Sequence, residues 1–134
     1  MALRRLPTPL PFPRARRIKQ GRDFLRAKTL GRRLVCGCLI LNWLPLPAAP
    51  VSRLGAVTSR KIGNAVARNR ARRLLREAFR LHQGALPLRV DLVLVARASI
   101  VGKKFSDVER DYLSALHRAG LLKPNESGAT PPHA

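Results

Sequence analysis

Residues 61–80 read Lys61-Ile-Gly-Asn-Ala-Val-Ala-Arg-Asn-Arg-Ala-Arg-Arg-Leu-Leu-Arg-Glu-Ala-Phe-Arg80. On an α-helix, with about 3.6 residues per turn, this stretch separates into two faces of opposite character. The apolar face, which we expect to pack, comprises Ala67, Ala71, Leu74, Ala78 and Leu81, with Leu75 at its edge. The opposite face carries Asn69, Arg72, Arg73, Arg76 and Arg80. The pattern therefore predicts a helix with one buried side and one side that is almost entirely guanidinium.

This helix has recognisable start and stop signals. Asn64 is a good N-cap, because its side-chain oxygen can accept a hydrogen bond from an otherwise unpaired backbone N–H group. Gly84 stands where a left-handed C-terminal residue is favoured, and Pro87 follows shortly after it. These signals predict a helix over residues 64–83.

The charge of the segment predicts a polyanionic partner. Between Arg60 and Arg80 there are eight basic residues and a single acid, Glu77. A solvated amphipathic helix normally mixes charges of both signs along its polar face. Here only Glu77 can form such pairs, with Arg73 or Arg80, so the face repels itself unless a polyanion binds.

The whole chain is strongly basic. Its 134 residues are enough for one domain with a modest core. The formal net charge is +20, and 19 of the 27 Lys and Arg residues lie within residues 1–33 and 60–80. Because 46% of the residues are hydrophobic, the chain is not a disordered basic tail. This balance predicts binding to nucleic acid or to an anionic membrane surface.

The apolar segments favour neither membrane insertion nor export. The most apolar stretch, residues 34–44, is shorter than the roughly 20 apolar residues that span a bilayer. Prolines interrupt the chain directly after it. Four more prolines alternate through residues 7–13, where a signal peptide needs a continuous apolar run. We therefore expect a cytoplasmic protein with no membrane partner.

The two cysteines predict no metal site. Cys36 and Cys38 are two positions apart on a predicted strand, so they face the same side and are poorly placed to bridge. No further ligands complete a four-ligand zinc set with them. We expect both to be reduced, small apolar residues.

The side chains needed for nuclease chemistry are also not grouped. A protein nuclease needs carboxylates for metal ions or a histidine acid–base pair. Asp107, Glu109 and Asp111 do fall close together, but at the start of a predicted helix, where they complement the helix dipole. The three histidines have no sequence-local partner, and no glycine-rich phosphate loop is present. We therefore predict no catalytic residue and no metal ligand in this chain.

The elements before the basic helix are one helix and two or three strands. Residues 18–28 predict a short helix. Residues 33–44 predict strand, in which Gly37 marks either a bulge or a turn between two short strands. Residues 53–59 predict a further strand, after a proline-rich loop over 45–50. Residues 1–17 read as a flexible, proline-rich basic extension.

After the basic helix, one strand and one helix complete the domain. Residues 90–96 have the continuous apolar pattern of a strand buried on both faces. Residues 106–119 predict a helix that begins with a capping box of Ser106 and Glu109. The order α-β-β-β-α-β-α predicts an α/β domain, an α+β sandwich of about four strands covered by helices, over residues 18–122. Residues 123–134 read as a disordered tail.

The basic stretch also resembles a known family. Lys61-Ile62-Gly63-Asn64-Ala65-Val66, then Arg68-Asn69-Arg70, then Arg72-Arg73-Leu74-Leu75-Arg76, is similar to the RNR motif of the bacterial ribonuclease P protein. The resemblance implies an accessory subunit of an endoribonuclease whose catalyst is the RNA subunit, with Mg²⁺ bound mainly by that RNA. It also implies a left-handed crossover through the basic helix, although the general rule strongly favours the right hand.

By resemblance, the protein binds the catalytic RNA and the single-stranded 5′ leader of precursor tRNA. It raises substrate affinity, lowers the Mg²⁺ requirement and needs no protein partner. The implied residues against the catalytic RNA are Arg60, Lys61, Asn64, Arg68, Asn69, Arg70, Arg72, Arg73, Arg76 and Arg80.

The implied leader site is the cleft between the first helix and the sheet, with Phe24, Arg22, Arg26 and Lys28. Phe24 matches a family phenylalanine that could stack on a nucleotide, but a packed core residue is an equal alternative. Lys28 stands where a second aromatic residue is often found. Asn42 or Trp43 falls where the family has an aromatic on the cleft strand.

Two other classes of protein share part of this pattern. A ribosomal protein has the same size, charge and lack of catalytic groups, but the Gly-Asn-Ala-Val entry followed by Arg-Asn-Arg argues against it. A sequence-specific DNA-binding module needs base-reading groups among its phosphate contacts, and this helix is too uniformly charged.

Overall fold

The computed structural model describes residues 16–49, 51–86 and 89–122. Residues 1–15 of the expected 1–17 extension, the expected tail over 123–134 and Pro87 lie outside the described residues. The helices are α1 (Gly21–Leu30), α2 (Ala65–His82) and α3 (Phe105–Arg118), and the strands are β1 (Arg32–Cys36), β2 (Leu39–Pro45), β3 (Arg53–Val57) and β4 (Val90–Ala96). Short 3₁₀ turns, η2 (Arg60–Ile62), η3 (Gln83–Ala85) and η4 (Ala98–Ile100), stand between them. This is the predicted order of elements.

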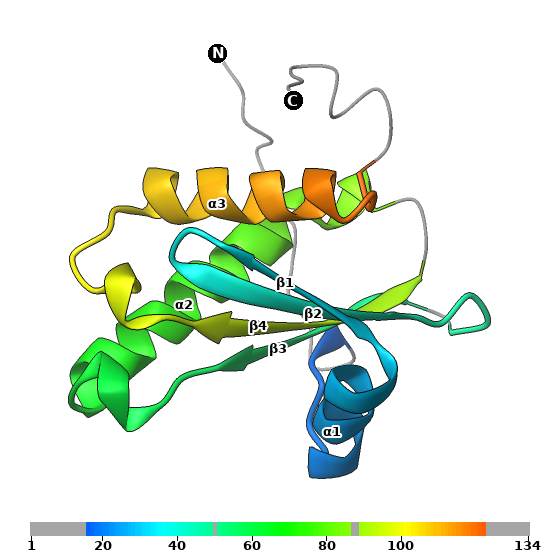
Figure 1. Ribbon diagram of the computed structural model, residues 1–134, viewed down its shortest axis with the longest axis horizontal. Coiled ribbons are helices and arrows are strands. Elements are labelled where there is room, and N and C mark those ends of the chain that lie inside the picture. The colour runs from blue at the N-terminus through cyan, green and yellow to red at the C-terminus, as the bar shows by residue number, and fades with distance from the viewer. Residues whose placement is uncertain (1–15, 50, 87–88, 123–134) are drawn as a thin grey trace.

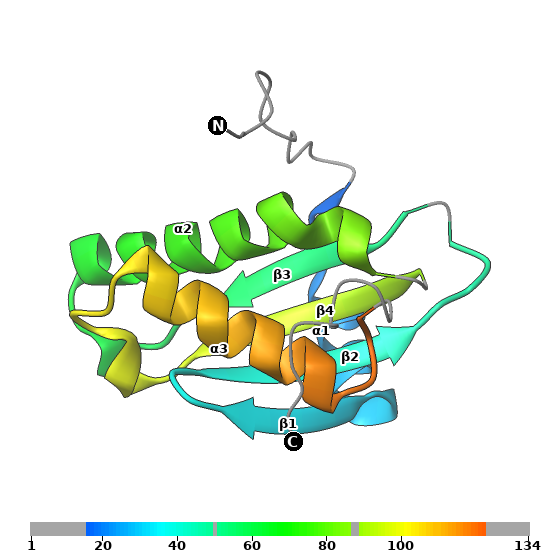
Figure 2. The same cartoon turned by 90° about the horizontal axis from the view of Figure 1, so that it is seen from above.

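The four strands form one mixed sheet in the order β1-β2-β4-β3. β2 pairs antiparallel with β1 and with β4, whereas β3 and β4 are parallel neighbours joined through α2. In Figure 2, with α2 and α3 toward the reader, the path along β3, back along α2 and into β4 moves to the left of the strand direction. The crossover is therefore left-handed, the rare hand for such a unit.

The helices divide between the two faces of the sheet. α2 and α3 cover one face, and α1 lies on the other (Figure 1). The main core lies under α2 and α3, where Leu92 and Leu94 of β4 meet Leu41 of β2 and the fully buried rings of Phe79 and Tyr112. The second core is much smaller and joins α1 to the sheet through Ile18, Ala27 and Val93.

The buried stripe of α2 is rotated from the predicted one. Ala71 and Ala78 are buried as expected, but Leu75 and Phe79 are the fully buried large side chains and Leu81 is 38% exposed. The difference arises because α2 contacts both the sheet and α3. Its buried side therefore turns toward the bulky Phe79, which the simple apolar stripe left out.

The two ends of α2 differ in how well the sequence predicts them. Asn64 is the N-cap, as predicted, and its Oδ1 accepts a hydrogen bond of 2.9 Å from the Ala67 N–H group. The prediction for Gly84 is wrong, because Gly84 lies inside η3 and is not among the glycines with positive φ. Gln83, the C-cap residue of α2, has a right-handed helical backbone conformation instead, and the chain continues directly into the 3₁₀ turn η3.

The predicted strand over 33–44 is a hairpin of β1 and β2, so of the two alternatives for Gly37 the turn between two short strands is confirmed. Gly37 has φ of 59°, and the Cys38 N–H group donates a 3.0 Å hydrogen bond to Oδ2 of Asp111. Cys36 and Cys38 are buried free thiols. Burial, with the neighbouring Asp111 carboxylate, raises the pKa of Cys38 to about 12.

The first helix is displaced toward the C-terminus, ending at Leu30 rather than at residue 28, and the third strand is shorter than predicted. α1 begins at Gly21 rather than at residue 18, because Arg17 and Ile18 are extended along β3. β3 ends at Val57 rather than at residue 59. Ser59 instead caps η2, its side chain accepting a hydrogen bond from the Lys61 N–H group.

The start of α3 uses a different acid from the one predicted. The Lys104 N–H group donates a 3.1 Å hydrogen bond to Oδ2 of Asp107, so the predicted capping box of Ser106 and Glu109 is wrong. Glu109 lies one turn further on, where its Oε2 is 2.6 Å from Nε2 of His82 on α2. Of the three clustered acids, only Asp107 therefore serves the helix start. Glu109 joins two helices, and Asp111 holds the hairpin turn.

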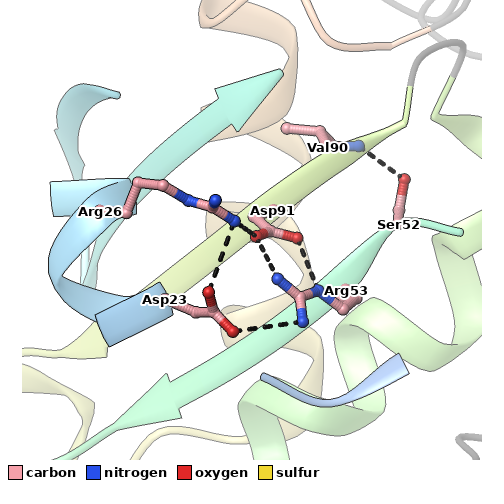
Figure 3. A network of polar contacts seen from close by, with 6 residues as sticks. All are labelled: Asp23, Arg26, Ser52, Arg53, Val90 and Asp91. Atoms are coloured by element: carbon pink, nitrogen blue, oxygen red, sulfur yellow. Dashed lines mark hydrogen bonds and ion pairs between the residues drawn. The ribbon is translucent and has the colours of Figure 1, made fainter. Parts of the chain in front are cut away.

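An ionic network fastens α1 to the sheet (Figure 3). Asp91 of β4 is 1% exposed and accepts two hydrogen bonds from Arg53 of β3, of 3.0 Å from Nε and 2.7 Å from Nη2. Asp23 of α1 lies 3.5 Å from Arg53, and Arg26 of α1 lies 3.8 Å from Asp91. The network therefore adds two ion contacts, Asp23 with Arg53 and Arg26 with Asp91, to the small apolar contact between α1 and the sheet.

We predict that Arg53→Ala lowers the free energy of unfolding by about 3 kcal/mol, because it leaves the buried Asp91 carboxylate without its bidentate partner. Denaturant titration measures this loss. The control is Arg110→Ala, which removes exposed ion pairs worth roughly 0–1 kcal/mol. The double variant Arg53→Ala/Asp91→Asn should recover part of the stability, and no recovery would contradict the assignment to an unpaired charge.

Candidate nucleic-acid interface

The outer face of α2 is hollowed and lined by cations. Arg72, Arg73 and Arg76 line a hollow of about 240 Å³, together with Asn69, Glu77 and Arg80. These include all five residues that the helical periodicity places on the polar side. The structure thus brings half of the ten predicted RNA-binding residues to one place.

Neighbouring polar groups orient two of these arginines. Nη1 of Arg72 donates a 2.6 Å hydrogen bond to Oγ1 of Thr58, just after β3, and its Nη2 donates to Oδ1 of Asn69. Arg80 forms an ion pair with Glu77, and this hydrogen bond lowers the pKa of the Glu77 carboxyl group. One acid in the hollow is therefore already neutralised by the helix itself.

The remaining positive charge in the hollow is not balanced. Within residues 16–49, 51–86 and 89–122, no acid forms an ion pair with Arg72, Arg73 or Arg76. Arg76 is half-buried, and burial together with the nearby Arg17 and Arg72 lowers the pKa of its guanidinium group. Like charges held together at partial burial cost free energy, and a bound anion offsets that cost.

The other five predicted RNA-binding residues do not line the hollow. Arg68 donates to the Gly63 carbonyl at 2.7 Å, and Arg70 reaches away to the Lys103 carbonyl at 2.7 Å. The Asn64 side chain is engaged as the N-cap. Arg60 and Lys61 are exposed on η2.

A second surface lies on the sheet face that α1 only partly covers. Four residues paired in register across β3, β4, β2 and β1 form one row on this face. They are, in that order, Val57, Val95, Ile40 and Val35. The first three are half-buried and Val35 is 38% exposed. Figure 1 shows α1 below the sheet, away from the end of β4 where this row lies. The row is a β-branched apolar strip that remains accessible.

Phe24 lies at the edge of this strip. It is half-buried, packs against the second core, and covers Gly55 so closely that a Cβ placed there would overlap the Phe24 ring. Arg22 and Lys28 of the same helix are exposed, whereas Arg26 is paired with Asp23 and lies near Asp91. All four predicted leader residues are thus exposed at least in part, and Arg26 also belongs to the network of Figure 3.

Neither predicted strand position supplies an aromatic ring to this surface. Trp43 points into the main core under α3. Asn42 does face the α1 side, but it is 3% exposed and donates a weak 3.5 Å hydrogen bond to the Val93 carbonyl. The accessible floor is therefore aliphatic.

The described residues also define what the surfaces contain besides cations. No group of three or more His, Cys, Asp or Glu side chains among them is placed to hold a metal ion. In the same part of the chain, no helix has both the length and the apolar character that crossing a bilayer requires.

An α+β domain with a left-handed βαβ unit and an arginine-lined helix face belongs to the class of small RNA-binding proteins. A family model described as ribonuclease P matches residues 12–120. The ribonuclease P protein component of Syntrophomonas wolfei is 38% identical over 109 residues, covering 81% of this chain and 91% of the relative. That of Gluconacetobacter diazotrophicus is also 38% identical over 109 residues, covering 81% and 94%.

Solved structures agree with this match. The ribonuclease P protein of Staphylococcus aureus has a TM-score of 0.74 at 27% identity, covering 82% of this chain and 100% of that one. The protein from Thermotoga maritima has a TM-score of 0.68 at 31% identity, covering 76% and 96%. The chain belongs to the ribonuclease P protein family. Its function is that of the protein subunit of the enzyme that processes the 5′ end of tRNA.

Two residues that contribute to the cationic surface, Thr58 and Arg17, are not predicted by the sequence pattern. Thr58 orients Arg72, and no local pattern points to it. Arg17 acts electrostatically on Arg76, although the sequence pattern places it in the flexible extension. The concentration of basic residues in 1–33 is the signal that could have found Arg17.

Proposed function

We propose that the hollow on α2 binds the catalytic RNA of ribonuclease P, and that the sheet face beside α1 binds the 5′ leader of precursor tRNA. In this way the subunit raises substrate affinity and lowers the Mg²⁺ requirement of the holoenzyme. It works in the cytoplasm with these two RNAs and needs no protein partner. The observation that carries the proposal is that three arginines of the hollow, Arg72, Arg73 and Arg76, form no ion pair with any described acid.

The chemistry of arginine supports the first half of the proposal. A guanidinium group is planar and donates two parallel hydrogen bonds, which match the oxygens of a phosphate. A-form RNA hides its base edges in a deep, narrow groove, so a protein binds it mainly through backbone and shape. Arg72, oriented by Thr58, and the half-buried Arg76 suit such contacts because part of their conformational entropy is already lost.

The apolar strip supports the second half. A single-stranded leader exposes its bases, and these can lie against apolar side chains while cations hold the backbone. The row formed by Val57, Val95, Ile40 and Val35, with Phe24 at its edge, offers such a floor, and Arg22 and Lys28 stand beside it. No base-specific hydrogen-bond pattern is needed, which suits leaders of varied sequence.

The Mg²⁺ ions of the reaction are held mainly by the RNA subunit in this proposal. The effect of the protein on them is electrostatic. Two RNA strands that approach one another repel through their phosphates, and divalent cations screen this repulsion. A protein with a net charge of +20 does part of the same screening, so fewer ions are required.

We predict that the protein lowers the Mg²⁺ concentration at which a bacterial ribonuclease P RNA cleaves precursor tRNA. Cleavage is measured over a Mg²⁺ series with RNA alone, with protein alone and with both. We expect none from RNA-free protein, and a shift to lower Mg²⁺ for the mixture. Cleavage by the protein alone, or co-purification with ribosomal subunits and no effect on the Mg²⁺ series, would overturn the proposal.

We predict that Arg68→Ala, Arg72→Ala and Arg73→Ala each weaken binding to the catalytic RNA without unfolding the domain. Each lost phosphate contact reduces the slope of log K against log salt concentration by roughly 0.7–0.9. Titrations at several salt concentrations measure the slopes. The matched control is Arg32→Ala, an exposed arginine on β1 at the opposite edge of the sheet. Equal slopes in all three variants and the control would show that these arginines face only solvent.

We predict that Phe24→Ala weakens binding of precursor tRNA to the holoenzyme and leaves mature tRNA, which has no leader, almost unchanged. A lost base–aromatic stack costs about 1–3 kcal/mol. Because Phe24 also packs over Gly55, the second variant is Phe24→Leu, which keeps apolar packing and removes the ring. A loss of melting temperature with equal losses for both RNAs, rescued by Phe24→Leu, would assign Phe24 to packing alone.

A further inference from the structure

The segment that precedes α1 is part of the sheet edge. Arg17 forms a parallel β-bridge with Leu54 of β3, and the Ile18 N–H group donates a 2.9 Å hydrogen bond to the Leu54 carbonyl. Since β3 is the last strand of the sheet, this segment extends the edge that lies nearest to α2. Figure 2 shows its described residues entering beside β3 and α2.

The side chain of Arg17 projects toward the α2 side. Ile18 is buried in the second core on the α1 side, and neighbouring residues of an extended chain point to opposite faces. Leu54, the bridge partner of Arg17, is buried in the main core beneath α2 and α3, and bridged residues share a face. Both arguments place Arg17 on the face where the hollow opens.

Arg17 is therefore close to the cations of the hollow. Burial is the largest cause that lowers the pKa of the half-buried Arg76 guanidinium group. The charges of Arg17 and Arg72 lower it further. Arg72 and Arg76 line the hollow itself. Glu77, the acid that lines it with them, is paired with Arg80. Arg17, at the sheet edge on the same face, thus adds its charge to that of Arg72 and Arg76, to which no described acid is ion-paired.

We propose that Arg17 joins Arg72 and Arg76 in one binding site for a backbone phosphate of the catalytic RNA. This inference rests on the function proposed above, and it extends the interface from α2 to the segment before α1. A phosphodiester matches the site because its two non-bridging oxygens can accept hydrogen bonds from more than one guanidinium group. Its negative charge also relieves the repulsion among the three cations.

A double-mutant cycle tests the shared phosphate. Affinity for the catalytic RNA alone is measured for Arg17→Ala, Arg76→Ala and the double variant, with circular dichroism to confirm folding. We expect each single variant to lose about tenfold, as for one charge-assisted hydrogen bond. The double variant should lose clearly less than the product of the two, because both side chains serve one phosphate. Arg17→Lys, which keeps the charge but not the fork, should lose less than Arg17→Ala.

The control cycle combines Arg17→Ala with Arg68→Ala, at the other end of α2. In this cycle the fold losses of affinity of the two single variants should multiply in the double variant. Binding by Arg17→Ala equal to the unchanged protein, or a multiplicative cycle with Arg76, would overturn the shared site. A loss confined to precursor tRNA would overturn the choice of RNA. The function itself is judged by Arg72→Ala in the same titration. If Arg72→Ala weakens binding and Arg17→Ala does not, only the shared phosphate site is overturned. Salt-independent binding by the unchanged protein would overturn both the shared site and the proposed function.

Discussion

The parallel pairing of β3 with β4 is the constraint on which the rest of the molecule depends. Parallel neighbours cannot be joined by a tight turn, so the chain must return along the full length of the sheet. α2 makes this return with 18 residues, which is about 27 Å of helix. One side of so long a helix is needed for the main core. The other side is left for five polar positions, four of them arginines, that lie together over the hollow.

The second consequence of this arrangement is the unequal covering of the sheet. α2 and α3 both lie on one face, so α1 alone serves the other. A small apolar contact and two ion contacts, Asp23 with Arg53 and Arg26 with Asp91, join α1 to that face. The part of the face that α1 does not reach keeps its β-branched row accessible. The two candidate RNA surfaces thus arise from one distribution of helices.

Features that depend on local chemistry could be predicted from the sequence. The Asn64 cap, the order of elements and the grouping of Arg72, Arg73 and Arg76 follow from spacing and hydrogen-bonding capacity alone. Features decided by long-range contacts could not. Leu81 fits the apolar stripe, yet contact with α3 turns the helix toward Phe79. By sequence Arg17 belongs to the proline-rich extension, since only its bridge to the distant Leu54 makes it part of the sheet edge.

Gly55 has a consequence for how this surface can vary among related sequences. The Phe24 ring lies over Gly55, and the space a Cβ would need there is filled by that ring. Position 55 therefore admits a larger side chain only if position 24 holds a smaller one or if α1 shifts. The two positions, 31 residues apart in the chain, form a single steric unit. An enlargement at position 55 on the candidate leader surface therefore requires a change at position 24, and homologues with a larger residue at 55 are expected to show a compensating difference at 24.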